Sequence, residues 1–368
     1  MQQELQTERL VSLDALRGFD MFFIIGGGAM IRSFCDADVN GFTRAIARQV
    51  DHSAWEGFTF CDIIMPLFMF IVGAAMPFSF AKRIGLGHGR TKLFVHVAKR
   101  VIILWVLGMM VQGNLLKYDL SQLQIYSNTL QAIAAGYLIS SILILNFSII
   151  NQIIITAGSL TCFWMFMRFV PFADNGAGVL EPANNFARHI EQICAGRFFV
   201  EGSTYTWFFS SITFGATVML GVFAGFLLKN EKLSKYGKFF FLVCIGAVLT
   251  VGGMVWGIWL PIIKHIWTSS FVLYAGGLSY LMLAAFYLVI DIWGLKKWSS
   301  GFVVIGANAI AAYMMAELFD FRLIGNIFVS GLERFVGPWY GFVQSAAAFF
   351  VLWLILFWMS RKKTFIKI

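Results

Sequence analysis

The sequence predicts an all-α, polytopic membrane protein, a helical bundle with about ten transmembrane helices. Two observations predict this fold class. Of the 368 residues, 59% are hydrophobic and 13% are charged. In a soluble domain about half of the residues are apolar and about a quarter are charged. The apolar excess is concentrated in runs without any charge, such as 239–260 and 341–360. About 20 apolar residues in a helix span the hydrocarbon core of a bilayer.

The same observations exclude several classes of protein. The long apolar runs exclude a soluble enzyme, a disordered chain and a small secreted domain, and they disfavour an outer-membrane barrel, whose strands alternate in short pieces. The net charge is +9, but the basic residues stand in short clusters between the apolar runs, which indicates membrane topology. We therefore expect the lipid bilayer as a partner and no nucleic acid.

Ten apolar segments are predicted as helices, because lipid offers the backbone no hydrogen-bond partner. They cover 13–33, 60–81, 97–116, 127–146, 149–170, 207–228, 239–260, 269–290, 301–318 and 339–360. Several contain glycine, for example at 26–28 and 276–277, which in a bundle permits close backbone approach or a local break. Together they form a single transmembrane domain over 1–368, without a soluble domain.

The distribution of Lys and Arg orients the bundle. With the N-terminus inside, the inner segments carry 17 of the 28 basic residues and the outer segments carry 10, while Arg17 lies within a span. Basic residues concentrate on the cytoplasmic side of membrane proteins. We therefore expect both termini in the cytoplasm and a multi-pass protein of the cell inner membrane.

Three loops stand out. The long outer loops 33–59 and 171–206 are expected to carry function, and residues 41–50 are predicted to form a short amphipathic helix on the membrane surface. The inner loop 82–100 is basic and contains a G-x-G-x-G pattern. It is either a positive-inside anchor or a phosphate-binding patch that faces the cytoplasm.

Ionisable residues at membrane depth cost about 2.5–3.5 kcal/mol on insertion scales, so each needs an explanation. Asp14, Arg17 and Asp20 open the first span at a spacing that places them near one helix face, and Arg17 can pair with either carboxylate. The group is either a structural ion pair or a device that orients a ligand entering from inside.

Amides and other polar residues mark further positions. Asn128 and Gln131 head the fourth span, Lys264 and His265 precede the eighth, and Asn308 lies in the ninth. Such amides commonly bridge helices, at about 0.6 kcal/mol on average; the alternative is that they contact a ligand.

His52 in the first outer loop is the candidate acid–base group, because the ordinary pKa of histidine lies near neutrality. A carboxylate that fixes its tautomer would complete a base–orienter pair. Asp51 is adjacent but points elsewhere if the segment is extended. Asp62 reaches His52 only if 53–61 folds back, which Gly57 would allow.

Two motifs are distinctive. Residues 9–18 are RLVSLDALRG, and residues 52–73 are HSAWEGFTFCDIIMPLFMFIVG, with the long pattern H-x-x-W-x-G-x-T-x-x-D-x-x-x-P-x-F-x-F-x-x-G. Both resemble the heparan-alpha-glucosaminide N-acetyltransferase family of transmembrane acyltransferases. Weaker similarity to this family follows at 130–131, 263–269 and 306–309. The chain lacks the added luminal domain and extra span of the animal members, so it looks like a bacterial member.

The resemblance implies an acyltransferase that moves acetyl from cytosolic acetyl-CoA across the membrane to the amino group of a terminal glucosamine or related oligosaccharide. It identifies His52 as the catalytic histidine and Asp62 as the acidic residue beside it. The residues expected to bind the acetyl-CoA cosubstrate are Asp14, Arg17, Asn128, Gln131, Lys264 and Asn308.

The sequence departs from the animal family at two positions. Ala132 stands where the animal proteins have arginine; if that arginine contacts the CoA phosphates, Lys264 or Arg17 would take its place. His265 stands where they have asparagine.

The chemistry of these residues agrees with acetyl transfer. His52 would accept the proton of the attacking amine, an effect typically of about 10²–10⁴-fold. Asn128, Gln131 or Ser/Thr hydroxyls would donate to the oxyanion. The basic inner face would attract the CoA phosphates, with the pantetheine arm threaded between helices towards His52. No metal or redox cofactor is implied, and a homodimer is compatible with the sequence.

Two other functions fit the sequence. A transporter for N-acetylglucosamine or another sugar would suit ten spans with glycine breaks, although no inverted repeat is visible and transport does not need a His–Asp pair. An O-acetyltransferase of envelope polysaccharide would share the chemistry but would activate a hydroxyl with His52.

Overall fold

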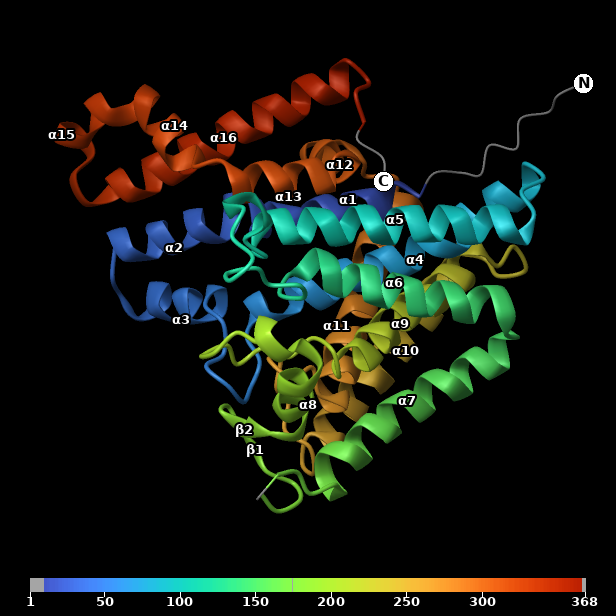
Figure 1. Ribbon diagram of the computed structural model, residues 1–368. Coiled ribbons are helices and arrows are strands. Elements are labelled where there is room, and N and C mark those ends of the chain that lie inside the picture. Colours follow the sequence, from blue (N-terminus) through green and yellow to red (C-terminus); the bar gives the residue numbers. More distant parts are fainter. Residues whose placement is uncertain (1–9, 174, 366–368) are drawn as a thin grey trace, which may run out of the picture.

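The computed structural model describes residues 10–173 and 175–365. In this part of the chain nine helices are long and apolar enough to cross a membrane, and a bent helix pair makes up to ten. The predicted all-α, multi-pass membrane bundle is therefore confirmed (Figure 1). Arg9 and Lys367, which belong to the predicted inner segments, lie outside the described residues.

The membrane-crossing helices follow the predicted order. They are α1 (Val11–Phe22), continued through a π-helical turn (Phe23–Gly27) into α2 (Gly28–Ala37), α4 (Ile64–Gly85), α5 (Arg90–Val111), α6 (Thr129–Asn146), α7 (Ile149–Phe169), α9 (Ser211–Lys229), α10 (Lys235–Trp256), α11 (Ser269–Tyr287), the bent pair α12 (Ser300–Ala307) and α13 (Ala309–Leu318), and α16 (Tyr340–Arg361). The shorter elements are α3 (Gly41–Val50), α8 (Phe186–Ala195), α14 (Phe321–Val329), α15 (Glu333–Val336) and a hairpin of β1 (Leu180–Glu181) and β2 (Asn184–Asn185). The predicted short helix at 41–50 is thus present as α3.

Two predicted spans have different bounds or shapes. Helix α5 begins at Arg90, seven residues before the predicted 97, because its first turns are polar and lie outside the apolar run. It ends before Asn114, which has a left-handed φ of 57°. The ninth span is broken at Asn308, and its halves α12 and α13 meet at 67°.

The segment before the last span is not the simple outer loop that the sequence predicted. Helix α14 packs along α16 instead. Gly325 makes this contact close, since a Cβ built on it would lie 2.6 Å from the backbone nitrogen of Ala348. The last apolar stretch therefore forms a helix pair rather than one isolated span.

Glycine shapes the bundle in the two ways that the sequence predicted. Gly26 has a φ of 139° and breaks the first span at its π-helical turn. Gly277 lets α11 approach α10, because a Cβ there would lie 2.4 Å from the backbone nitrogen of Thr250. Such contacts give membrane helices close packing without a hydrophobic driving force.

Helices α4 and α9 form the buried centre of the bundle. In the most apolar stretch of each, 78% and 72% of the residues are buried. They contact each other through reciprocal glycines. A Cβ on Gly73 would lie 2.0 Å from the Val218 carbonyl oxygen, and one on Gly221 would lie 1.9 Å from that of Phe70. The elements that carry the candidate site surround this pair.

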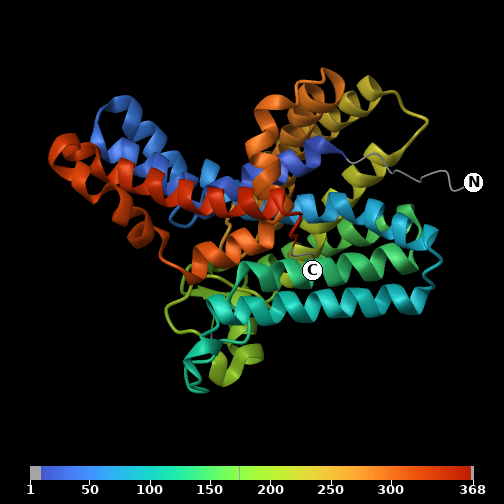
Figure 2. The same cartoon turned by 90° about the horizontal axis from the view of Figure 1, so that it is seen from above.

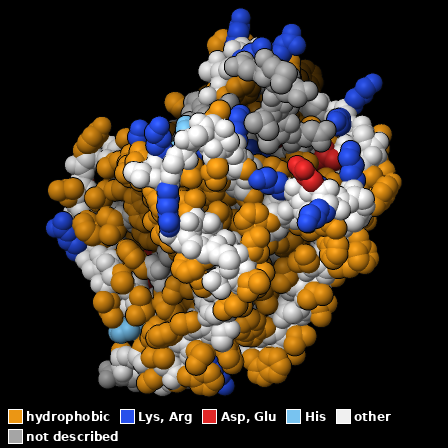
Figure 3. Space-filling view, turned by 90° about the vertical axis from the view of Figure 1, so that its right-hand side faces the viewer, with side chains coloured by type: hydrophobic (Ala, Val, Ile, Leu, Met, Phe, Trp, Pro, Cys, Tyr) orange, Lys and Arg blue, Asp and Glu red, His pale blue; other side chains and the backbone are white. Residues whose placement is uncertain are grey.

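The two ends of the bundle differ. Figure 1 places α3, α8 and the β-hairpin at one end, and Figure 2 shows α5 running beside α6 toward the other. Figure 3 views the end where α4 joins α5, and Lys and Arg side chains dominate its charged residues. This basic end is the one that the sequence predicts to face the cytoplasm.

Candidate active site

His52 and Asp62 meet at the end of the bundle that carries α3 and α8, which we call the outer end because the sequence predicts that it faces outside. His52 Nδ1 lies 2.9 Å from Asp62 Oδ1. The loop between them folds back as the sequence required, with Gly57 at a φ of 112°, a conformation that glycine adopts without strain. The Gly57 N–H donates to the Ile262 carbonyl oxygen at 3.0 Å, which fastens this loop to the segment before α11.

The Asp62 carboxylate organises the loop. It is fully buried, and its Oδ2 accepts hydrogen bonds from the Ser53 hydroxyl at 2.9 Å, the Ser53 N–H at 3.2 Å, the Thr59 N–H at 3.0 Å and the Thr59 hydroxyl at 3.1 Å. A buried carboxylate with this many donors holds its position firmly. Asp62 therefore fixes the orientation of the His52 ring.

Lys264 completes a cluster of three. Its buried Nζ lies 3.3 Å from Asp62 Oδ1 and 3.1 Å from His52 Nδ1. From the sequence, Lys264 was a candidate contact for the CoA phosphates. The structure places its ammonium against Asp62 at the outer end instead, because the 257–268 segment folds over the His52 loop through the Glu56–Ile263 bridge.

Two of these groups have shifted pKa values. The hydrogen bond to Asp62, followed by the contact with Cys61, raises the pKa of His52 to about 9, although burial and Lys264 oppose the shift. Burial lowers the pKa of the Lys264 ammonium, against the attraction of Asp62. One carboxylate thus faces two basic groups, and the pKa values of His52 and Lys264 are shifted in opposite directions.

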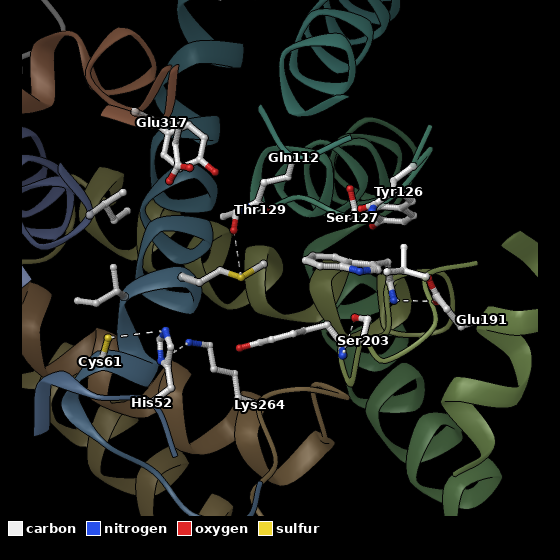
Figure 4. A pocket seen from close by; sticks show the side chains of 18 of the residues that line it. His52, Cys61, Gln112, Tyr126, Ser127, Thr129, Glu191, Ser203, Lys264 and Glu317 are labelled. Atoms are coloured by element: carbon white, nitrogen blue, oxygen red, sulfur yellow. Dashed lines mark hydrogen bonds between the residues drawn. The ribbon is translucent and has the colours of Figure 1, made fainter. Parts of the chain in front are cut away.

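A cavity of about 540 Å³ lies beside the cluster. Figure 4 shows His52, Cys61 and Lys264 on one wall, with Glu317, Gln112 and Thr129 across the cavity and Tyr126, Ser127, Glu191 and Ser203 at its other end. The His52 side chain is 50% exposed and also lines a groove between α2 and α3 on the outer surface. The imidazole therefore stands between outside solvent and the interior cavity.

Asn128 and Gln131 do not reach this cavity in the part of the chain that the structure describes. They form a capping box at the start of α6. The Asn128 amide donates to Gln112 Oε1 and the Tyr313 hydroxyl, both at 3.1 Å, and the Gln131 amide donates to the Ile125 carbonyl oxygen at 2.7 Å. The expectation that they stabilise an oxyanion is wrong, because both lie fully buried behind the cavity wall.

A second cavity, of about 310 Å³, lies between the first cavity and the basic end of the bundle, and we call it the inner cavity. Its basic residues are Arg17, Arg83, His96 and Arg100. The Arg100 Nε is buried without a hydrogen-bond partner among the described residues, and its guanidinium lies 4.4 Å above the Tyr137 ring. An anion is the ligand that such a pocket would accept.

The other predicted cosubstrate residues lie around this second cavity or beside it. Arg17 lines it and pairs with Asp14 at 3.3 Å. Asn308 stands at the break between α12 and α13, where its amide donates to the Thr364 carbonyl oxygen at 3.3 Å. Arg83 and Arg100, which from the sequence belong only to a basic loop, complete the pocket.

The two cavities are lined by neighbouring positions of the same helices. On α4, Met65 lines the outer cavity and Phe68 the inner one, and on α13 Tyr313 and Ile310 do the same. These positions are three residues apart, about 4.5 Å along a helix. A long ligand held in the inner cavity would thus need to pass little more than one side-chain layer to reach His52.

Comparison with known proteins gives one partial match. Residues 9–139 match a family described as a domain of unknown function, DUF5009. This region is about a third of the chain and includes His52, Asp62 and the three arginines of the inner cavity, but not Lys264. No curated protein matches the chain.

Proposed function

We propose that this chain is an integral-membrane acetyltransferase of the heparan-alpha-glucosaminide N-acetyltransferase family. It moves acetyl from cytosolic acetyl-CoA to the amino group of a glucosamine-type sugar on the outer side of the cell inner membrane. The observation that carries the proposal is the His52–Asp62 pair, which lies at the outer end of two adjoining cavities whose inner member is basic.

The inner cavity suits the nucleotide end of the donor. Arg17, Arg83 and Arg100 present guanidinium groups, which bind phosphate in a bidentate way. From Arg100 to Gln112, which lines the outer cavity, α5 advances twelve residues or about 18 Å. The extended pantetheine arm of acetyl-CoA would bridge such a distance and bring its thioester, the activated acyl group, into the outer cavity.

His52 supplies the acid–base group. Asp62 and Lys264 contact its Nδ1, and the nitrogen that faces away from Asp62 is Nε2, which has Cys61 Sγ 3.8 Å away. Transfer to an amine releases a proton, and Nε2 is placed to receive it. Asp62 holds the ring in the required tautomer and stabilises the imidazolium, as an orienting carboxylate does in other acyl-transfer sites.

The outer end of the cavity suits a sugar. Tyr126, Tyr205 and Trp207 line it, and aromatic rings with a polar tip pack against apolar faces while hydrogen-bonding at their edges. The Glu317 carboxylate points into the same cavity (Figure 4). A carboxylate there would attract the ammonium form of an amino sugar before it loses its proton.

Purified protein incubated with radiolabelled acetyl-CoA and glucosamine tests the proposal. Wild type should form labelled N-acetylglucosamine, and His52→Ala should lower the rate by at least about 100-fold. His189→Ala, which removes another histidine from an outer helix, serves as the matched control and should keep the wild-type rate. Full activity of His52→Ala would remove His52 from the mechanism, and labelled ester instead of amide would favour O-acetylation.

The discontinuous ninth span favours sugar transport as a second candidate. Broken helices at membrane depth often form the substrate sites of transporters, and α12 and α13 meet at Asn308 with a bend of 67°. Proteoliposomes separate the two functions. Uptake of labelled N-acetylglucosamine without consumption of acetyl-CoA would support transport and contradict the transferase.

A further inference from the structure

Cys61 lies on the free side of the His52 ring. Its Sγ is 3.8 Å from His52 Nε2, within the longer range of hydrogen bonds to sulfur, and Figure 4 shows both side chains at the same wall. The opposite ring nitrogen, Nδ1, contacts Asp62 at 2.9 Å. The neighbouring residues 61 and 62 therefore bracket one imidazole, in the order thiol, base and orienting carboxylate.

The backbone produces this arrangement. Cys61 and Asp62 belong to a short 3₁₀ turn, Phe60–Ile63, that precedes α4. Thr59 caps the turn and binds the Asp62 carboxylate through its N–H. Cys61 is half-buried and lines the outer cavity, so its sulfur is reachable by a molecule bound there.

The other cysteines have different surroundings. Cys35 is buried, Cys244 is half-buried, and Cys162 and Cys194 are exposed. Among the described residues, Cys61 is the cysteine with a hydrogen-bonded histidine. Reactive cysteines sit beside a base or cation and are partly accessible, whereas structural ones are not.

We propose that Cys61 is the nucleophile that first accepts the acyl group, so that the reaction runs through an S-acetyl-Cys61 intermediate. This inference rests on the proposed function, since it specifies how the same site would transfer acetyl. It adds a covalent step and assigns to His52 the role of the base that serves a thiol.

The first half-reaction is a thioester exchange. The Cys61 thiolate, whose proton is held on His52 Nε2, attacks the carbonyl carbon of the donor thioester. The Sγ–C bond forms and the C–S bond to the donor breaks. The departing thiolate takes the proton from Nε2 and leaves as a free thiol. One thioester replaces another, so the activated acyl group is conserved.

The second half-reaction delivers the acyl group. The amine of the acceptor attacks the carbonyl carbon of S-acetyl-Cys61, the N–C bond forms and the Sγ–C bond breaks. His52 Nε2 takes one proton from the attacking nitrogen, which regenerates the imidazolium and the Cys61 thiolate. The sum is donor thioester plus amine giving amide plus free thiol, with no further reactant.

The charge state of the cluster fits this order of events. Asp62 and Cys61 raise the pKa of His52 to about 9, so the imidazole carries near neutral pH the proton that the departing donor thiolate needs. Once that proton has left with the donor thiol, Nε2 is unprotonated beside S-acetyl-Cys61. His52 then meets the acceptor as a neutral base.

Labelling of the full-length purified protein tests the proposal. With radiolabelled acetyl-CoA and no acceptor, an acid quench should trap label on the peptide that contains Cys61. Neutral hydroxylamine, which cleaves thioesters, should release that label as acetohydroxamate. Cys61→Ala should lose this label and reduce transfer to glucosamine by at least about 100-fold. Cys194 is an exposed cysteine on α8, and Cys194→Ser should keep both the label on Cys61 and the wild-type rate of transfer.

A second measurement needs no acetyl donor. Iodoacetamide at pH 7 should alkylate Cys61 at least about tenfold faster than Cys194 in the same molecule, and His52→Ala should abolish the difference. If wild type acetylates glucosamine while Cys61 carries no label and Cys61→Ala keeps the full rate, the intermediate is refuted and the proposed function stands. If wild type neither transfers nor becomes labelled, the proposed function fails, and the intermediate with it.

Discussion

The Lys264 ammonium contacts Asp62 Oδ1 at 3.3 Å, across 202 residues of sequence. This contact joins the segment before α11 to the loop that carries His52, and it makes two distant parts of the chain one site. The buried carboxylate is stabilised by Lys264 and by the hydroxyl and N–H donors of its own loop. Asp62 therefore holds the two segments together in addition to orienting His52.

Replacement of Lys264 should test that dual role. Lys264→Met leaves the buried Asp62 carboxylate without its ammonium, and removal of one partner of a buried ion pair costs about 3–5 kcal/mol. We expect the free energy of unfolding to fall by about 3 kcal/mol, measured by tryptophan fluorescence during thermal unfolding in detergent. Lys117→Met, at an exposed outer lysine, should change it by less than about 0.5 kcal/mol. Equal stability of both variants would show that Lys264 adds nothing to the cluster.

The His52–Asp62 contact should give the protein a defined pH dependence. The pKa of His52 is raised from 6.5 to about 9 in the folded chain, so the folded state binds the proton more tightly than the unfolded state does. The resulting stability is fully present below pH 6.5 and is lost as the pH rises through about 9. The difference in melting temperature between wild type and His52→Gln should therefore shrink from pH 6 to pH 10. A difference that grows over this range would contradict the assignment.

The inner cavity should determine affinity for the donor. Arg100→Gln removes a guanidinium whose buried Nε has no hydrogen-bond partner in the described structure. Because hydrogen bonds to charged groups contribute about 1.5–3 kcal/mol, the Kd for coenzyme A should rise at least about tenfold. Isothermal titration calorimetry measures this without catalysis. The adjacent Lys99 is exposed, so Lys99→Gln removes one positive charge outside the cavity. This variant should bind coenzyme A with the wild-type Kd. Equal losses in both variants would mean that only the general charge of the inner face matters.

Close packing of the central helices should make one glycine indispensable. A Cβ on Gly73 would overlap the Val218 carbonyl oxygen at 2.0 Å, so Gly73→Ala must push α4 away from α9 and should cost at least about 2 kcal/mol or prevent folding. A Cβ added to Gly158, on α7, would meet nothing within 4 Å, and Gly158→Ala should be neutral or stabilising. Detergent gel filtration and thermal unfolding of the two variants compare them directly. Similar behaviour would contradict the close α4–α9 contact.

The sequence predicted the features that depend on local pattern. Apolar runs indicated the helices, and the ten-residue separation of His52 and Asp62 around Gly57 allowed their contact to be expected. The contact of Lys264 with Asp62 could not be expected, because tertiary packing alone brings together residues so far apart in sequence. Cys61 was part of the distinctive motif, but only the turn geometry shows that its side chain reaches His52.

Other discrepancies between sequence and structure also have physical reasons. Asn128 and Gln131 are three residues apart at a helix start, which is the spacing of a capping box. Their side-chain amides form hydrogen bonds with the backbone and with neighbouring side chains rather than with a ligand. The break at Asn308 left no hydropathy signal, because both halves of that span are apolar.

Transfer across a sealed membrane tests the central claim most directly. Proteoliposomes would hold glucosamine inside and receive radiolabelled acetyl-CoA outside, with protein oriented so that its basic end faces the acetyl-CoA. We predict labelled N-acetylglucosamine in the lumen with wild type, and at least about 100-fold less with His52→Ala. If correctly oriented wild-type protein leaves the lumen free of labelled N-acetylglucosamine while acetyl-CoA is supplied at its basic end, the account is contradicted.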